Sequence, residues 1–209
     1  MQSPRNELAN CITHAVATAL SLACLALLVV FASLRGSVWH IVSFSVYGAT
    51  MVLLFLSSTL YHGFKNPSVK HVFHVIDHGA IYLLIAGSYT PLLLTVFRED
   101  HPGWSWTLFG LVWTIAALGI VLKIFHTGRF RMVSTGLYLL MGWLIVMAVK
   151  PLFNSIPRPA FFWLLAGGVM YTLGVAFYLI KRIPYHHAVW HLFVLAAALC
   201  HFVCIFFYI

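Results

Sequence analysis

The feature of this chain that most constrains its fold is a series of long apolar runs separated by short breaks. A helix needs about 20 mostly apolar residues to cross the hydrocarbon core of a bilayer. Such runs occupy residues 12–34, 40–63, 72–97, 105–125, 132–149, 160–180 and 186–208. The pattern therefore predicts an all-α, polytopic membrane protein with a bundle of seven transmembrane helices. Six are expected instead if the short fifth run does not span.

The low charge of the chain supports the same prediction. Only 8% of its 209 residues are charged and 62% are hydrophobic, whereas soluble domains average about 25% charged residues. The seven runs use up most of the length, so we expect residues 1–209 to form a single integral membrane domain. The net charge of +8 comes from basic residues scattered between the runs, which favours contact with anionic membrane lipids and argues against nucleic acid.

The basic residues also predict an orientation, because they are concentrated in cytoplasmic loops. With the N-terminus in the cytoplasm, eight basic residues fall inside: Arg5, Lys65, Lys70, Lys123, Arg129, Arg131, Lys181 and Arg182. Four fall outside: Arg35, Arg98, Lys150 and Arg158. The distribution favours an N-in, C-out topology.

Polar residues gather at the ends of four of the predicted spans. They are Glu7, Asn10 and His14 at the start of the first, Ser58 and His62 at the end of the second, His71, His74, Asp77 and His78 at the start of the third, and His186, His187 and His191 at the start of the seventh. In the predicted topology all four places lie at cytoplasmic helix ends. Because ionisable groups inside a membrane are costly, their convergence at one depth indicates a functional site.

The spacing of these residues fits a metal site. His187 and His191 are four residues apart, so they project from one helical face, while His62 comes from another helix with Ser58 one turn before it. Three imidazoles suit Zn²⁺ and leave a fourth position for water, although imidazoles also bind other metals. Asp77 either binds the metal directly or accepts a hydrogen bond from that water, for which it is also a candidate general base.

The other histidines have simpler interpretations. A lone histidine at a helix end usually keeps its polar tip in the headgroup region, which we expect of His71 and His186. His74 and His78 share a face around Asp77, so they are candidates for partners of the site or for a proton path. His201 lies too deep to join the cluster, and a helix–helix hydrogen bond is expected for it.

Two structural alternatives stay open at this point. The three histidines and the aspartate can form a hydrogen-bonded network that only packs helices together. Glu7 can serve only as an acid that complements the dipole at the start of its helix.

These same residues resemble the bacterial haemolysin III family, which belongs with the progestin and adipoQ receptors and the alkaline ceramidases in the CREST superfamily of membrane hydrolases. The similar stretches are Glu7-x-x-Asn10-x-x-x-His14, the run from Ser57 to His62, the run from Asp77 to Pro91, and the run from Pro184 to His191. The resemblance covers nearly the whole chain, and within this family the chain looks close to the inner membrane proteins of Gram-negative bacteria.

The resemblance implies a specific set of ligands. By it, zinc is held by His62, His187 and His191, and Asp77 is reached through water. Ser58 corresponds to the serine of the superfamily's Ser-x-x-x-His motif. The topology that it implies is also seven helices, N-in and C-out.

Three functions follow as hypotheses. The leading one is a zinc-dependent hydrolase of a lipid amide, similar to a ceramidase, in which Asp77 moves the proton, Ser58 helps to position the oxyanion, and the substrate carries an acyl chain. The second is a non-enzymatic, receptor-like regulator of membrane lipid homeostasis or energetics that uses zinc as a structural pin. The third, a haemolysin that forms pores, is disfavoured because seven uniformly apolar helices would aggregate before crossing water.

Overall fold

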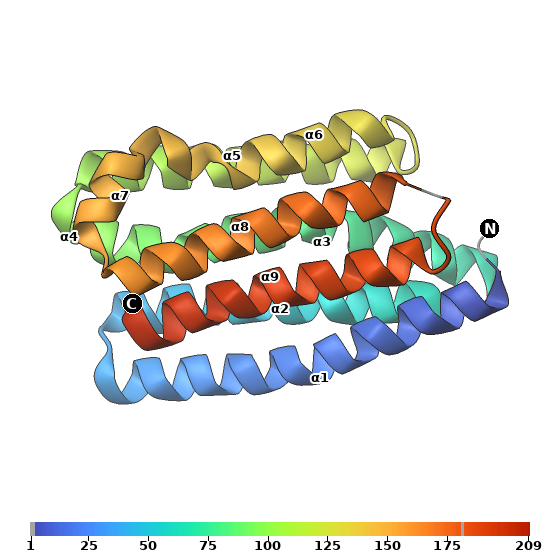
Figure 1. Cartoon of the computed structure of the whole chain (residues 1–209), viewed down its shortest axis with the longest axis horizontal. Coiled ribbons are helices and arrows are strands. Elements are labelled where there is room, and N and C mark those ends of the chain that lie inside the picture. The colour runs from blue at the N-terminus through green and yellow to red at the C-terminus, as the bar shows by residue number, and fades with distance from the viewer. Residues whose placement is uncertain (1–2, 181) are drawn as a thin grey trace.

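The computed structural model describes residues 3–180 and 182–209 and is a bundle of long, roughly parallel helices (Figure 1). Six spans are α1 (Pro4–Arg35), α2 (Val38–Gly63), α3 (Pro67–Leu92) with its extension, α5 (Pro102–His126), α8 (Arg158–Leu179) and α9 (His186–Tyr208). The extension of α3 is a π-helical turn, η1 (Leu93–Phe97), followed by α4 (Arg98–Asp100). The fifth span is built from α6 (Arg131–Gly142), the 3₁₀ turn η2 (Leu144–Ala148) and α7 (Val149–Ser155).

The described residues form seven helical segments that are long and apolar enough to cross a membrane, so the predicted fold class is confirmed. An odd number of spans puts the two termini at opposite ends of the bundle, as Figure 1 shows. The N-in, C-out orientation stays a prediction from the basic residues. One of those residues, Lys181, lies outside the described part of the chain.

Two spans begin well before their apolar runs, further than helix ends usually differ from a sequence-based boundary. The first helix begins at Pro4 rather than at residue 12, and the side chain of Ser3 accepts a hydrogen bond from the backbone N–H of Asn6. The third begins at Pro67 rather than at residue 72, after the capping residue Asn66. A polar N-cap followed by proline is a favourable helix start, so the helices continue beyond the apolar core into polar turns that carry the candidate site.

The fifth span is longer than predicted and is broken. It reaches Ser155, although Lys150 and Pro151 suggested an end at residue 149. Pro151 is tolerated because it lies in the first turn of α7, where its missing N–H has no intrahelical partner to lose. Despite the break, the span is long and apolar enough to cross a membrane, so the described residues favour seven spans over six.

A tyrosine of α3 forms hydrogen bonds with the backbone groups that the break in the fifth span leaves free. The hydroxyl of Tyr89 lies 3.0 Å from the carbonyl oxygen of Met141 and 2.8 Å from that of Gly142, and it accepts a hydrogen bond of 3.0 Å from the N–H of Ile145. Backbone groups that a broken helix frees inside a membrane need such partners, because lipid offers none.

The four helices that carry the predicted site share one buried core. Side chains of α1, α2, α3 and α9 form this cluster, and the Tyr47 hydroxyl of α2 donates a 2.7 Å hydrogen bond to the carbonyl oxygen of Ala198 in α9. At Gly87 of α3, an added Cβ would lie 2.2 Å from Oγ1 of Thr50 in α2. This close approach locks α2 against α3 and so fixes the relative positions of their polar ends.

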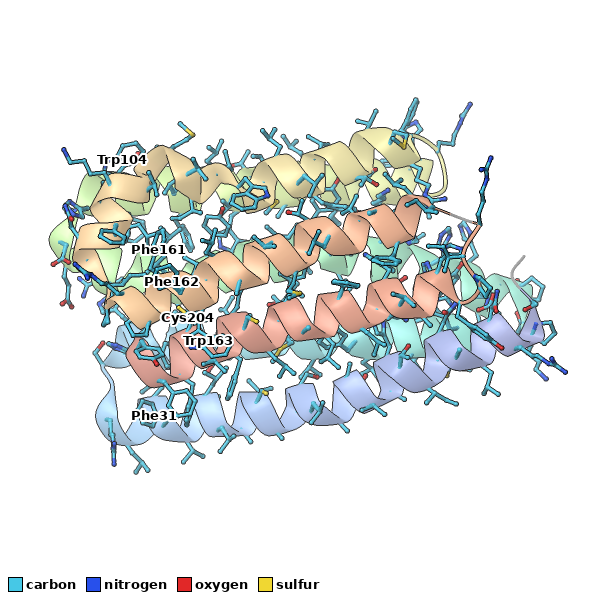
Figure 2. The ribbon with its side chains drawn as sticks, in the orientation of Figure 1. Phe31, Trp104, Phe161, Phe162, Trp163 and Cys204 are labelled. Atoms are coloured by element: carbon cyan, nitrogen blue, oxygen red, sulfur yellow. The ribbon has the colours of Figure 1, made fainter. Side chains whose placement is uncertain are left out.

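Exposed aromatic side chains lie at the end of the bundle that holds the C-terminus, opposite the polar ends of α1, α2, α3 and α9. Figure 2 shows Trp104 and Phe162 at the end that holds the C-terminus, and both are exposed. Such side chains are typical of a membrane–water interface.

Candidate metal centre

Four chain segments meet at the end of the bundle that holds the N-terminus (Figure 1). They are the first turns of α1, the last turn of α2, and the first turns of α3 and α9. The convergence predicted from the sequence is therefore present in the fold, and the contacts below show which of its residues meet.

Three histidines form a group that can hold a metal ion. One ring nitrogen each of His62, His187 and His191 lies within 4.8 Å of the other two. The ring centroids are 4.6 Å apart for the two histidines of α9, and 5.3 Å separates His62 from each of them. His62 and His191 are buried and His187 is partly exposed. Two neighbouring turns of one helix and the end of another thus supply three imidazoles around one point.

The orientation of His62 is set by Glu7 of α1. Nδ1 of His62 lies 2.7 Å from Oε2 of Glu7, and the other carboxylate oxygen lies 3.3 Å from Nζ of Lys70. A carboxylate only accepts hydrogen bonds, so Nδ1 of His62 is the donor and carries the proton. In the neutral ring, Nε2 then keeps its lone pair for a metal.

The orientation of His191 is set in the same way by Thr13 of α1. The Thr13 hydroxyl donates to backbone carbonyl oxygens, with distances of 3.0 Å to Ala9 and 2.9 Å to Asn10. Its only proton is thereby used, and its oxygen lies 3.1 Å from Nδ1 of His191. Nδ1 of His191 is therefore the donor, and Nε2 again keeps its lone pair.

The two Nε2 atoms are the ones left for a metal. Both are buried, and neither has a hydrogen-bond partner among the described residues. Metal-binding histidines usually donate their other ring N–H to a carboxylate or another oxygen, which fixes the tautomer and the ring orientation. His62 and His191 show this arrangement, so the residues present fit a metal ion coordinated by imidazole nitrogens.

Asp77 and Ser58 lie together beside this group. Asp77 is buried, with a carboxyl group that the Ser58 hydroxyl approaches without forming a hydrogen bond of standard geometry. Ser58 is one turn before His62 on α2, which connects the carboxyl group to the histidines. Among the described residues, the group that could hold a metal ion comprises the three histidines without Asp77. A role for Asp77 as a ligand or as a base stays a prediction.

His14 lies directly against the metal-binding group without being part of it. Its ring stacks on that of His191, with centroids 3.5 Å apart and 17° between the planes, and its edge meets Phe55 at 5.2 Å. Both of its ring nitrogens are buried without a hydrogen-bond partner among the described residues. His14 thus borders the site as a buried polar ring without a hydrogen-bond partner among the described residues.

The remaining histidines make separate contacts. Nδ1 of His186 lies 3.0 Å from the carbonyl oxygen of Phe177. His71 is exposed. His78 donates from Nδ1 to the carbonyl oxygen of His74 at 2.9 Å, and the same nitrogen lies 3.8 Å from Oδ2 of Asp77, so His78 borders the site as its spacing predicted. The helix–helix hydrogen bond expected of His201 is confirmed, because its Nε2 lies 3.2 Å from the carbonyl oxygen of Leu164 in α8.

An apolar cavity begins beside the site and runs along the bundle. It measures about 180 Å³. Most of its lining comes from α3, the fifth span, α8 and α9, and Leu54 of α2 and His14 of α1 complete the wall. Trp190 and Tyr178 line it near the metal-binding histidines, and Tyr171 and His201 line it deeper in the bundle. For comparison, an engineered apolar cavity of about 150 Å³ takes up benzene, so this cavity has room for a ligand.

Sequence reasoning did not find two residues of the site. Thr13 carries no charge and was not singled out, although it lies three residues after Asn10 and directly before His14 on the same helix. Lys70 appeared only as a basic loop residue, yet it pairs with Glu7 and donates to the carbonyl oxygen of Tyr61 at 3.0 Å. The i, i+3 spacing from Asn10 is the signal that would have revealed Thr13.

Comparison with known proteins gives consistent results. The model of the family described as haemolysin-III related matches residues 2–202. The chain is 45% identical to Hemolysin-3 of Bacillus cereus, with 100% of this chain and 94% of that protein covered. It is 47% identical to a Hemolysin-3 homolog of Bacillus subtilis (strain 168), covering 98% and 94%. It is 33% identical to the human monocyte to macrophage differentiation factor, covering 96% and 83%.

The bacterial relatives and the seven apolar spans indicate a multi-pass membrane protein, consistent with a bacterial inner membrane. The family match covers nearly the whole chain, and it includes all four segments that meet at the histidine group. The chain belongs to the haemolysin-III-related family.

Proposed function

We propose that this protein is a zinc-dependent membrane hydrolase that cleaves the amide bond of a lipid. The observation that carries the proposal is the pair of buried Nε2 atoms of His62 and His191, which face a common point because Glu7 and Thr13 hold the opposite nitrogens. Together with His187 they give three imidazole ligands. Three protein ligands and an open fourth position are typical of catalytic rather than structural zinc sites.

The residues around this point suit hydrolysis of an amide. A zinc ion held by the three histidines would polarise a carbonyl group and lower the pKa of its water toward about 7. Asp77 accepts the proton of the attacking water and returns it to the leaving amine. The Ser58 hydroxyl donates a hydrogen bond to the oxygen that becomes negative in the transition state. The carbonyl C–N bond breaks, a C–O bond forms, and the products are a carboxylic acid and an amine.

The cavity supports a substrate with an acyl chain. Its wall is mostly apolar, it lies within the membrane-spanning part of the bundle, and His14 connects it to the histidine group. An acyl chain in this cavity places its head group at the metal-binding end. In the N-in orientation that end faces the cytoplasmic leaflet, so the substrate is a membrane lipid of that leaflet.

The first experiment is the metal content of detergent-purified protein, measured by mass spectrometry. We expect about one zinc per chain in the wild type and none in the double variant His187→Ala/His191→Ala. His126→Ala is the matched control, because His126 is exposed and remote from the group, and it should keep the metal. Absence of metal from the wild type would reduce the cluster to a helix-packing network.

Turnover then separates a hydrolase from a regulator with a structural zinc. Acyl-amide lipids are incubated with wild-type protein, and release of the fatty acid is followed by mass spectrometry. If the protein is a regulator with a structural zinc ion, metal is bound but no product forms. The proposal requires that product forms with the wild type and is absent with the double variant.

A further inference from the structure

A second group of unpartnered polar atoms lies deep in the apolar cavity. The Oη atom of Tyr171 in α8 and Nδ1 of His201 in α9 are buried, and neither has a hydrogen-bond partner among the described residues. Their rings meet edge to face with centroids 5.7 Å apart, and both residues line the cavity. Buried polar groups without a partner are destabilising by about 1–3 kcal/mol each, and lipid cannot supply a partner.

The backbone of α8 fixes what His201 offers. Nε2 of His201 lies 3.2 Å from the carbonyl oxygen of Leu164, which only accepts, so Nε2 carries the proton. Close packing holds the ring there, since a Cβ added at Gly167 would lie 2.3 Å from this nitrogen. In the neutral ring, Nδ1 is then an acceptor without a donor.

Tyr171 supplies the complementary group. Its hydroxyl is a donor without an acceptor among the described residues, so two touching rings that line the cavity carry one unpaired donor and one unpaired acceptor. A hydroxyl group both accepts and donates, and it satisfies both atoms. A ketone only accepts, so it satisfies Tyr171 alone, and a methylene satisfies neither.

We propose that Tyr171 and His201 form a deep polar subsite that binds a hydroxyl group in the middle of an otherwise apolar ligand chain. His201 lies ten residues after the metal-binding His191 on α9, which places the subsite about 15 Å along the helix axis from the histidine group. A chain whose head group lies at the histidines therefore brings its middle to the subsite. The inference rests on the proposed function in placing an acyl chain in the cavity, and it narrows the substrate class to hydroxylated chains.

The subsite is tested with ligands that no amidase cleaves. Three alcohols of equal chain length are compared: octadecanol with a mid-chain hydroxyl, octadecanol with a mid-chain ketone, and plain octadecanol. Binding to detergent-purified protein is measured by displacement of the fluorescent polyene parinaryl alcohol. Since one neutral hydrogen bond is worth about 0.5–1.5 kcal/mol, each bond should strengthen binding about two- to ten-fold. The hydroxylated alcohol should bind most tightly, the ketone less tightly and plain octadecanol least tightly.

Two variants that keep an aromatic ring separate the two contacts. In Tyr171→Phe the ketone should bind no more tightly than plain octadecanol, and the hydroxylated chain should bind more weakly than it does to the wild type. His201→Phe should lower the hydroxylated chain to the level of the ketone without changing the ketone. Ser88→Ala is the matched control, because Ser88 lines the same cavity but already donates to the carbonyl oxygen of Ile85 at 2.8 Å. It should keep the full order.

Two outcomes would overturn the subsite. Equal binding of the three alcohols by the wild type means that the two atoms bind an ordered water only. An unchanged order in Tyr171→Phe, with the thermal unfolding of this variant matching the wild type, excludes the assigned donor. Loss of fold in His201→Phe would not affect this decision, because Tyr171→Phe tests the donor separately. If the order holds but amides are not turned over, the hydrolase proposal fails while the subsite stands.

Discussion

Nδ1 of His62 lies 2.7 Å from Oε2 of Glu7, and this contact joins a candidate metal ligand at the end of α2 to the first turn of α1. Glu7 contributes no atom to the metal-binding group. It determines instead which nitrogen of His62 carries a proton and where the ring points. Thr13, two turns further along α1, does the same for His191. The helix α1 therefore acts on the site through the outer nitrogens of two histidines.

Replacing Glu7 should weaken metal binding without removing a ligand. Loss of a partner of this kind typically lowers metal affinity 10- to 100-fold, and we expect this range for Glu7→Leu. Glu7→Gln keeps an oxygen that accepts from Nδ1, so its loss should be smaller. Affinity is measured by competition with a chromophoric zinc chelator. Glu99→Leu is the control, since Glu99 is exposed and pairs with Arg98 at the opposite end of the bundle. Equal affinities of Glu7→Leu and wild type would show that the contact does not orient the ligand.

The hydroxyl of Thr13 gives an independent test on the same helix. Thr13→Val keeps the shape of the side chain but removes the acceptor for Nδ1 of His191, so zinc affinity should fall about ten-fold or more. Thr13→Ser keeps the hydroxyl and should bind zinc nearly as well as the wild type. The same chelator competition decides between them. A parallel loss in both variants would point to packing of the Thr13 methyl group rather than to the hydrogen bond.

His14 should be dispensable for metal binding although it touches a ligand. His14→Phe keeps an aromatic ring on the face of His191, so about one zinc per chain is expected to remain. His191→Phe, which exchanges the neighbouring ring in the same way, should lose the metal. Metal content by mass spectrometry checks both variants. Loss of zinc from His14→Phe would mean that a nitrogen of His14 enters the coordination sphere.

Asp77→Asn should separate metal binding from catalysis. The amide is similar in size to the carboxyl group but is a poor proton acceptor, and general acid–base catalysis is typically worth about 100- to 10,000-fold in rate. We therefore expect a loss of amide hydrolysis in this range with zinc retained. Asp100→Asn is the control, because Asp100 lies on α4 outside the site. Full hydrolytic activity of Asp77→Asn would show that another group is the base.

The close contact between α2 and α3 should be sensitive to a single methyl group. In Gly87→Ala the new Cβ meets Oγ1 of Thr50 at 2.2 Å, and such overpacking typically costs about 1–3 kcal/mol. Adding Thr50→Ala removes that oxygen and should restore part of the stability. Gly110→Ala, where an added Cβ meets nothing within 4 Å, should not destabilise the protein. Denaturant unfolding in detergent, followed by circular dichroism, measures all four proteins including the wild type.

Much of the fold was predictable because a membrane restricts the choices so strongly. Apolar runs of sufficient length indicated seven spans, and the described part of the chain forms seven helical segments that are long and apolar enough. The errors were at the ends, where polar caps such as Ser3 and Asn66 extend helices beyond the apolar run. The fifth span was predicted too short because Pro151 indicated the end of a helix. In the structure it lies in the first turn of a new helix, α7, which continues the span. A tyrosine distant in sequence, Tyr89, satisfies that break, and no local pattern reveals it.

The sequence by itself determined the fold class, the four polar segments and the three histidines that meet, because helical spacing and span order place residues at a common depth. Only the tertiary structure decided what each nitrogen does. Contacts between α1 and its neighbours assign the proton to Nδ1 of His62 and of His191, and the backbone of α8 assigns it to Nε2 of His201. A histidine offers two nearly equivalent nitrogens, so its role depends on a partner from another helix, whose approach is set by packing and not by spacing along the chain.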